Sequence, residues 1–221
     1  MDKRTQIIES IRSQGLLPLY FHPDPGVSVA VMGALGEAGI LAMEYTNRGE
    51  SALQNFEHLR KVRDLRYPGL LLGAGTIKDA KEARQFIGAG ADFLVSPGLS
   101  EDVFDASYSE KILWIPGCMS VTEIMRAEQF GLTFVKLFPG SLLGPSFVQA
   151  IREIFPSLSF MPTGGVELEE SNLKDWFKAG AAAVGMGSKL ITTEMLNRKN
   201  FGAITSAAAS AIEAIAKARK G

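Results

Sequence analysis

One lysine interrupts an apolar run of the kind that forms a buried strand. The run covers residues 133–138, where Lys136 stands between Val135 and Leu137. A strand of a parallel sheet is covered on both faces, so an ammonium group there loses its hydration unless it is paired or neutral. Desolvation favours the neutral amine, which is the form that attacks a ketone. Lys136 is therefore a candidate Schiff-base nucleophile, and a strand-end lysine that reaches solvent is the open alternative.

A carboxylate interrupts a second apolar run in the same way. Glu44 lies within residues 40–45, and Thr46 and Arg48 follow at alternate positions. Strand side chains alternate faces, so these three residues share one face if the strand stays regular that far. A carboxylate among apolar groups can move protons, and a structural ion pair between Glu44 and Arg48 is the open alternative. Together, Lys136 as the nucleophilic amine and Glu44 as the proton-transferring carboxylate would be the fewest groups that imine chemistry requires.

Three glycine-rich turns follow apolar runs and could hold an anion. They are Gly73-Ala74-Gly75-Thr76, Pro162-Thr163-Gly164-Gly165 and Gly185-Met186-Gly187-Ser188. Glycine lets backbone N–H groups approach an anion closely, and a helix that begins there would add its positive end. The last two turns follow the seventh and eighth expected strands, where phosphate often binds in α/β barrels. A simple turn between a strand and a helix is the alternative for each.

The elements that would position these groups alternate along the whole chain. We expect strands at residues 16–21, 40–45, 70–73, 92–96, 112–115, 133–138, 159–162 and 182–185. Helical spacing appears at residues 27–38, 51–63, 78–87, 121–130, 147–154 and 173–179, and residues 207–218 form a closing helix. Gly39, Gly90, Gly131 and Gly180 follow helices, where a left-handed cap is common. The alternation predicts one domain over residues 1–221, a (β/α)₈ TIM barrel with an additional N-terminal helix over residues 1–15. In such a barrel the chemistry lies at the carboxyl ends of the strands.

Composition excludes several classes of function. The 221 residues are 46% hydrophobic and carry a net charge of -1, with Lys and Arg scattered, so we expect no nucleic-acid partner. No apolar stretch approaches the length of a membrane span, roughly 20 residues. Cys118 is the only cysteine, which favours a reducing, cytoplasmic setting and a packed thiol. His22 and His58 are the only histidines, so a zinc site with three imidazoles cannot exist, and we expect no metal or cofactor. The sequence assigns no role to His22.

The ordered motifs resemble one family over nearly the whole chain. They are Glu44-Tyr45-Thr46-Asn47-Arg48, Gly73-Ala74-Gly75-Thr76, Val95-Ser96-Pro97-Gly98, Ile115-Pro116-Gly117, Val135-Lys136-Leu137-Phe138-Pro139 and Pro162-Thr163-Gly164-Gly165. This set resembles the aldolases that cleave 2-keto-3-deoxy-6-phosphogluconate (KDPG) or 4-hydroxy-2-oxoglutarate (KHG). The resemblance implies a class I aldolase that acts on a phosphorylated 2-keto acid, releases pyruvate and forms a homotrimer.

The resemblance also implies a role for individual residues. Lys136 would form the Schiff base and Glu44 would be the general acid and base. The carboxylate end of the substrate would contact Arg48, Thr76 and Pro97, and Phe138 would pack beside the pyruvyl carbon. Thr163 would contact the substrate near C4, and the phosphate would bind Gly164, Gly165, Gly187 and Ser188.

Departures from the family pattern leave alternatives open. Phe21-His22 stands where some members carry an arginine, and Lys189 stands where some place a tryptophan after the serine. Phosphogalactonate aldolases share most of these motifs, although Thr163 favours the phosphogluconate type. A phosphosugar epimerase or a thiamin-phosphate synthase would share the phosphate turns without needing Lys136. A non-catalytic phosphometabolite-binding barrel would need neither Lys136 nor Glu44.

Overall fold

The computed structural model of the chain describes residues 2–220 and has an α/β fold. All strand pairings among these residues are parallel. The strands are β1 (Leu16–Tyr20), β2 (Ala42–Thr46), β3 (Leu71–Gly75), β4 (Phe93–Val95), β5 (Leu113–Ile115), β6 (Gly117–Cys118), β7 (Phe134–Leu137), β8 (Ser159–Pro162) and β9 (Val184–Met186). The helices are α1 (Lys3–Gln14), α2 (Pro25–Glu37), α3 (Ala52–Arg66), α4 (Ala80–Gly88), α5 (Glu101–Ser109), α6 (Val121–Gln129), α7 (Gly140–Ile151), α8 (Glu170–Ala179), α9 (Thr193–Asn197) and α10 (Phe201–Ala218).

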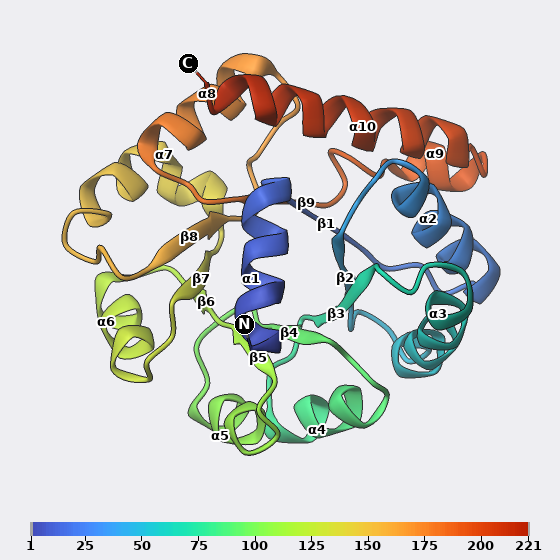
Figure 1. Ribbon diagram of the computed structural model, residues 1–221, viewed down its shortest axis with the longest axis horizontal. Coiled ribbons are helices and arrows are strands. Elements are labelled where there is room, and N and C mark those ends of the chain that lie inside the picture. Colours follow the sequence, from blue (N-terminus) through green and yellow to red (C-terminus); the bar gives the residue numbers. More distant parts are fainter. Residues whose placement is uncertain (1, 221) are drawn as a thin grey trace.

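The strands form two sheets that lie around a common centre. One sheet has six strands in the order β5-β4-β3-β2-β1-β9, and the other has three in the order β6-β7-β8. An isolated parallel bridge between Thr163 and Gly185 links the end of β8 to β9. Between β5 and β6, the carbonyl oxygen of Pro116 accepts a hydrogen bond from the Lys136 backbone nitrogen at 2.9 Å. Figure 1 shows the strands in the middle of the molecule with the other helices arranged around them, and α1 across the centre.

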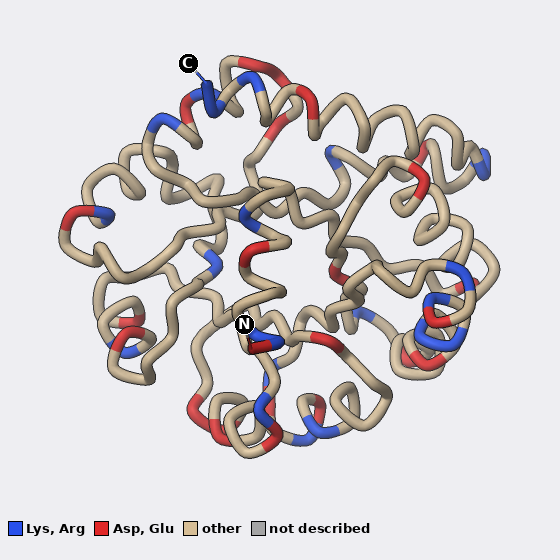
Figure 2. The backbone as a smooth tube through the Cα atoms, viewed as in Figure 1, with Lys and Arg blue, Asp and Glu red and all other residues tan. Residues whose placement is uncertain are grey.

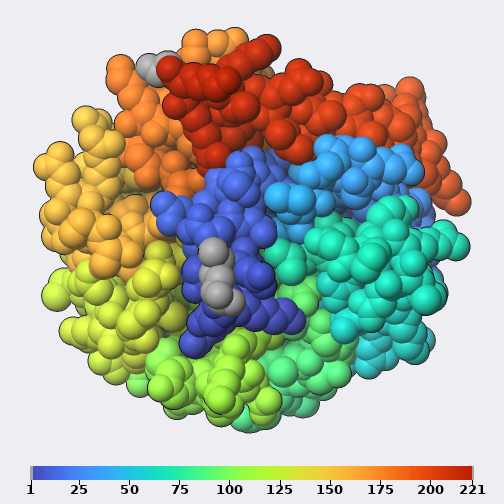
Figure 3. Space-filling model, in the orientation of Figure 1, coloured from blue at the N-terminus to red at the C-terminus, as the bar shows by residue number. Residues whose placement is uncertain are grey.

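Side chains of the strands point alternately toward the helices and toward the centre. The larger hydrophobic cluster joins outward residues such as Met43, Tyr45 and Val135 to the surrounding helices. A second, inner cluster consists of Ile7, Ile11, Leu17, Ala42, Phe93, Val95, Leu113, Ile115, Phe134, Met161 and Ala183. Because Ile7 and Ile11 belong to α1, this helix closes the amino-terminal ends of the strands. Figure 3 shows α1 covering the middle of this face.

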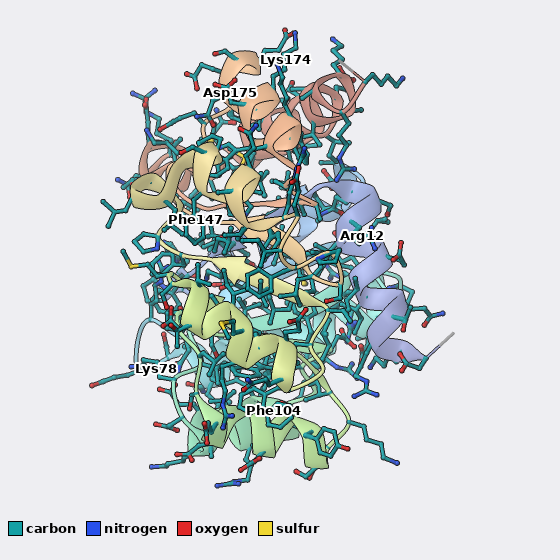
Figure 4. The ribbon with its side chains drawn as sticks, turned by 90° about the vertical axis from the view of Figure 1, so that its left-hand side faces the viewer. Arg12, Lys78, Phe104, Phe147, Lys174 and Asp175 are labelled. Carbon is teal, nitrogen blue, oxygen red and sulfur yellow. The ribbon has the colours of Figure 1, made fainter. Side chains whose placement is uncertain are left out.

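The opposite face carries the loops that follow the strands. In the side view of Figure 4, Arg12 on α1 and Lys78, which follows β3, lie on opposite sides of the molecule. The carboxyl ends of the strands, where we expected the chemistry, are therefore on the face away from α1. Figure 2 shows acidic and basic residues interspersed over the outer helices and α1.

Two polar side chains attach α1 to the rest of the fold. The Gln14 amide hydrogen-bonds to backbone groups of Leu16, Leu41 and Ala42, which join α1 to β1 and the start of β2. The Arg219 guanidinium donates to the carbonyl oxygen of Arg12 at 2.7 Å and to that of Ala182 at 2.6 Å. The predicted N-terminal and closing helices are thus present, apart from residue 1, which lies outside the described residues.

Most predicted elements are confirmed, and the differences have local causes. Each of the eight predicted runs overlaps a strand, and the fifth is followed beyond Pro116 by β6. Helices α5 and α9 were not predicted, and α7 begins at Gly140 instead of near residue 147. Gly144 within α7 has φ 71°, which interrupts the helix and hides its first turn from a periodicity argument. None of the helices within residues 2–220 combines the length and the apolar character that a membrane crossing requires.

Candidate active site

Lys136 lies on β7 with its side chain on the inner face. Its neighbours Val135 and Leu137 pack outward, whereas Phe134, two residues earlier, belongs to the inner cluster. Its register partner on β8 is Met161, which also belongs to that cluster. Lys136 is only 5% exposed, so its side chain does not reach solvent and the alternative of a solvent-exposed strand-end lysine is wrong.

The Lys136 amine has an aromatic neighbour instead of a counter-ion. Nζ lies 5.1 Å from the centroid of the half-buried Phe138 ring. Within residues 2–220, no acceptor takes a hydrogen bond from Nζ and no carboxylate lies within ion-pair distance of it. A buried amine without a polar partner is costly for folding, which makes it a candidate for chemistry with a carbonyl compound.

Glu44 occupies the equivalent kind of position on β2. It is 1% exposed, and it lies two residues beyond Ala42 of the inner cluster, on the same face of the strand. Neither carboxylate oxygen has a hydrogen-bond partner within the described residues. Gly75 on β3 leaves the space that this carboxylate fills, because a Cβ atom at Gly75 would collide with Glu44 Oε1. Glu44 and Lys136 therefore both lie on the inner face, on different strands, and neither side chain has a partner within residues 2–220.

Arg48 does not share this inner face by strand alternation. Strand β2 ends at Thr46, and the Arg48 backbone nitrogen folds back to the Thr46 carbonyl oxygen at 3.0 Å. The Arg48 side chain is exposed, and no ion pair joins it to Glu44. The structural Glu44–Arg48 pair, which was the alternative to proton transfer, is wrong.

Thr76 and Pro97 follow β3 and β4 and are half-buried. Thr76 has φ 62°, a left-handed conformation that is rare for a β-branched residue and costs of order 1–3 kcal/mol. Hydrogen bonds fix the backbone on either side of Thr76. Gly75 O accepts from the Asn47 backbone nitrogen at 2.7 Å, and Ile77 N donates to Val95 O at 3.1 Å. Pro97 lies against the next loop so closely that a Cβ atom at Gly117 would collide with its carbonyl group.

The turns after β8 and β9 lie next to each other at the Thr163–Gly185 bridge. The buried hydroxyl oxygen of Thr163 has no hydrogen-bond partner within the described residues, and Gly185 leaves room for it, since a Cβ atom there would collide with Oγ1. Gly164 and Gly165 have φ 84° and 76°, in the left-handed region. No protein acceptor in residues 2–220 takes a hydrogen bond from the backbone N–H of Gly164, Gly165, Gly187 or Ser188. These four N–H groups are available to an anion.

The expected helix N-termini are absent from these turns. Helix α8 begins at Glu170 and α9 at Thr193, several residues beyond Gly165 and Ser188. After Gly165 the chain is irregular until α8 starts. After β9, the backbone nitrogens of Leu190 and Ile191 donate to Gly187 O, which closes a single turn before α9. The first turn of α7 lies against the turn after β8 instead, because a Cβ atom at Gly140 would collide with Gly164 O and one at Gly165 with Ser141. The helices that follow the two turns therefore direct no dipole at an anion bound here.

The main polar feature that the sequence missed surrounds the carbonyl oxygen of His22. It accepts hydrogen bonds from Tyr45 Oη at 2.8 Å, Ser28 Oγ at 2.9 Å and Asn55 Nδ2 at 3.1 Å. These donors come from β2, α2 and α3, so no local sequence pattern could have linked them. The network holds the loop after β1, which belongs to the same rim as the glycine turns.

Cys118 is a packed thiol, as expected. It is 1% exposed, and burial, with a smaller contribution from Glu123, raises its pKa from 9.0 to about 12. It is therefore protonated at neutral pH and is a poor nucleophile. Within residues 2–220, no cluster of three or more His, Cys, Asp or Glu residues is arranged to hold a metal ion.

Comparisons with known proteins point to one protein family. Residues 7–207 match the family described as KDPG and KHG aldolase. A 2-dehydro-3-deoxy-phosphogluconate aldolase of Pseudoalteromonas atlantica is 33% identical over 208 residues, covering 92% of this chain and 93% of the relative. A KHG/KDPG aldolase of Escherichia coli K12 is 31% identical over 187 residues, covering 84% of this chain and 85% of the relative.

A solved structure extends the likeness to the fold. KDPG aldolase from Legionella pneumophila, with pyruvate captured as a covalent carbinolamine intermediate, superposes with a TM-score of 0.84. Its sequence is 27% identical, and the match covers 92% of this chain and 96% of that one. A carbinolamine is the first covalent species in imine formation between an amine and a ketone.

Proposed function

The chain belongs to the KDPG and KHG aldolase family, and we propose that it is a class I aldolase that cleaves KDPG to pyruvate and glyceraldehyde 3-phosphate. We also propose KHG, which lacks the phosphate, as a second substrate. One observation supports the proposal: a buried amine, Lys136, and a buried carboxylate, Glu44, both lie on the inner face of the strands without a partner among the described residues. Substrate atoms would supply the interactions that both groups lack.

The reaction would begin with attack of neutral Lys136 Nζ on the C2 ketone. Glu44, directly or through one water, relays one proton from the attached amine to the C2 oxygen and donates a second one. The oxygen then leaves as water and a cationic iminium remains. The Glu44 carboxylate then accepts the proton of the C4 hydroxyl, and the C3–C4 bond breaks because the iminium accepts its electron pair. The aldehyde leaves, the enamine takes a proton at C3, and hydrolysis frees pyruvate and Lys136.

The remaining residues would hold the ends of the substrate. Arg48, Thr76 and Pro97 would contact the carboxylate end, and Phe138 the pyruvyl carbon beside Nζ. Thr163 would contact the substrate near C4, where its free hydroxyl could distinguish the gluconate from the galactonate configuration. Gly164, Gly165, Gly187 and Ser188 would bind the phosphate through their free N–H groups, which positions the bond to be broken.

We infer that the two sheets close into a single (β/α)₈ barrel domain. Counting β5 and β6 as one strand interrupted at Pro116 leaves eight strands, each followed by a helix. The Thr163–Gly185 bridge supports closure on one side, and the Lys136–Pro116 hydrogen bond supports it on the other. This proposal covers residues 1–221, of which 1 and 221 lie outside the described residues.

We further propose a cytoplasmic homotrimer. Exposed apolar side chains support contact with other copies: Met119 before α6, Val121 and Met125 on α6, and Leu142 on α7 are 41–72% exposed. Such side chains suit an interface between protomers. Size-exclusion chromatography with light scattering would measure the oligomeric state, and a monomer at micromolar concentration would contradict the trimer.

Reductive trapping tests the central proposal. With pyruvate and sodium borohydride, we expect a stable adduct on the peptide that contains Lys136, and we expect Lys136→Ala to abolish turnover. An adduct on another lysine, or none, would remove Lys136 from its role. Insensitivity to borohydride would favour an epimerase or a synthase. A lactate dehydrogenase assay that compares the phosphogluconate and phosphogalactonate substrates decides between the epimers, and no pyruvate release from either would favour a binding protein.

A further inference from the structure

We propose that Lys189 determines specificity for phosphorylated substrates, because its ammonium group leaves Glu167 and pairs with the substrate phosphate. In the structure, Lys189 Nζ lies 3.0 Å from Glu167 Oε1. This inference rests on the proposed function, since it adds a charged contact to the phosphate site formed by the turns after β8 and β9.

The ion pair joins the two turns whose N–H groups are free. Lys189 directly follows Ser188 in the turn after β9, and Glu167 lies two residues after Gly165 in the turn after β8. The Glu167 backbone is fixed, because its nitrogen donates to Asn172 Oδ1 at 2.9 Å. Lys189 thus extends from one phosphate-binding turn toward the other.

The charges of these turns leave one candidate for neutralising a phosphate. Residues 162–170 contain Glu167, Glu169 and Glu170 but no lysine or arginine, and residues 185–192 contain only Lys189. The helices that follow these turns begin only at Glu170 and Thr193, and the first turn of α7, which lies against Gly165, adds no formal charge. A phosphate dianion bound by N–H groups alone would face nearby carboxylates, so a cation at Lys189 supplies the missing charge.

The existing pair is weak enough to exchange. The Lys189 and Glu167 side chains are 57% and 35% exposed, and an ion pair in such a setting contributes little to stability. A phosphate carries up to two charges and offers several oxygens to the same ammonium group. Glu167 therefore holds Lys189 over the turns in the free protein and competes with the phosphate for it.

Two single variants distinguish this role from a purely structural one, in which the ion pair would only stabilise the two turns. Lys189→Gln should lower the ratio of kcat/KM for KDPG to kcat/KM for KHG about three- to ten-fold, as expected for a partly exposed charged hydrogen bond. Glu167→Gln should leave this ratio unchanged or raise it, because Lys189 then has no competitor. Lys174→Gln removes a comparable exposed pair with Glu170, on α8, and should leave the ratio unchanged.

Equilibrium dialysis with radiolabelled inorganic phosphate gives a readout that does not depend on turnover. Phosphate should bind the wild type and Glu167→Gln more tightly than Lys189→Gln, with a stronger dependence on salt. An unchanged ratio and unchanged phosphate binding in Lys189→Gln would overturn the inference. Equal losses in Lys189→Gln and Glu167→Gln would overturn it as well, because the pair would then only brace the turns. Absence of wild-type turnover would refute the proposed function, while dialysis would still decide the role of Lys189.

Discussion

Gly75 and Glu44 share one small space: the position of a Cβ atom on Gly75 is occupied by the Glu44 carboxylate. The two residues lie on adjacent strands, and Gly75 pairs in register with Thr46, two residues beyond Glu44. The missing side chain on β3 therefore determines where the proposed proton carrier can stand.

Gly75→Ala should displace the Glu44 carboxylate without removing it. If Glu44 moves protons, we expect Gly75→Ala to lower kcat toward the loss in Glu44→Gln, about 10²–10⁴-fold. Pyruvate release measured with lactate dehydrogenase checks this, and circular dichroism checks the fold. Gly69→Ala is the control, because its Cβ atom would meet nothing within 4 Å. Full activity of both Gly75→Ala and Glu44→Gln would contradict the assignment of Glu44 as the residue that transfers protons.

The face of the Phe138 ring should favour the cationic iminium on Lys136. A cation over an aromatic ring is stabilised by about 0.5–2 kcal/mol, so Phe138→Leu should slow pyruvate-dependent inactivation by borohydride about 2- to 30-fold. Phe138→Tyr keeps the ring and should retain most of the rate. Equal rates in the leucine and tyrosine variants would show that the ring face contributes nothing.

The ion pair between Arg63 and Asp92 lies near the amino-terminal ends of the strands and should stabilise the fold. Arg63 Nη1 lies 2.7 Å from Asp92 Oδ2, which also accepts from the Leu72 backbone nitrogen at 2.9 Å, and both side chains are buried. Arg63 keeps an ion pair with Asp64 at 2.9 Å and a hydrogen bond to Leu70 O at 2.7 Å. Asp92→Asn should therefore lower the free energy of unfolding by about 1.5–3 kcal/mol, the loss expected for hydrogen bonds between charged groups. Urea unfolding measures this loss. Glu194→Gln, which breaks an exposed pair with Arg198, is the control and should change little. A loss in Asp92→Asn no larger than in this control would contradict the prediction.

Cys118 should make the protein less stable at alkaline pH. The folded state keeps the thiol proton up to a pKa of about 12, whereas the ordinary value is 9.0. Between these values the unfolded chain binds fewer protons than the folded one, so a rise in pH favours unfolding. The wild type should therefore lose stability more steeply than Cys118→Ala above pH 9.0, by up to about 1.4 kcal/mol per pH unit. Parallel slopes for the two proteins would show that burial does not raise the pKa of this thiol.

Local pattern alone determined the βα alternation and the two polar residues inside apolar runs. Lys136 and Glu44 could be found because a charged residue in a strand covered on both faces is exceptional, whatever surrounds it. Gly39, Gly90, Gly131 and Gly180 all adopt the left-handed conformation expected after helices. These features depend on residues close together in the chain, so they can be predicted from the sequence alone.

Tertiary structure decided which of these groups meet. Alternation assigns a side chain to one of two faces, but only the pairing of strands decides which face is inside and what lies opposite. The space that Gly75 leaves for Glu44, and Gly185 for Thr163, is made by neighbouring strands far apart in the sequence. The early end of β2 turned Arg48 away from the face that alternation predicted. Helices α8 and α9 start too late to direct their positive ends at the glycine turns that precede them. Such outcomes depend on backbone geometry and long-range packing, which no short stretch of sequence specifies.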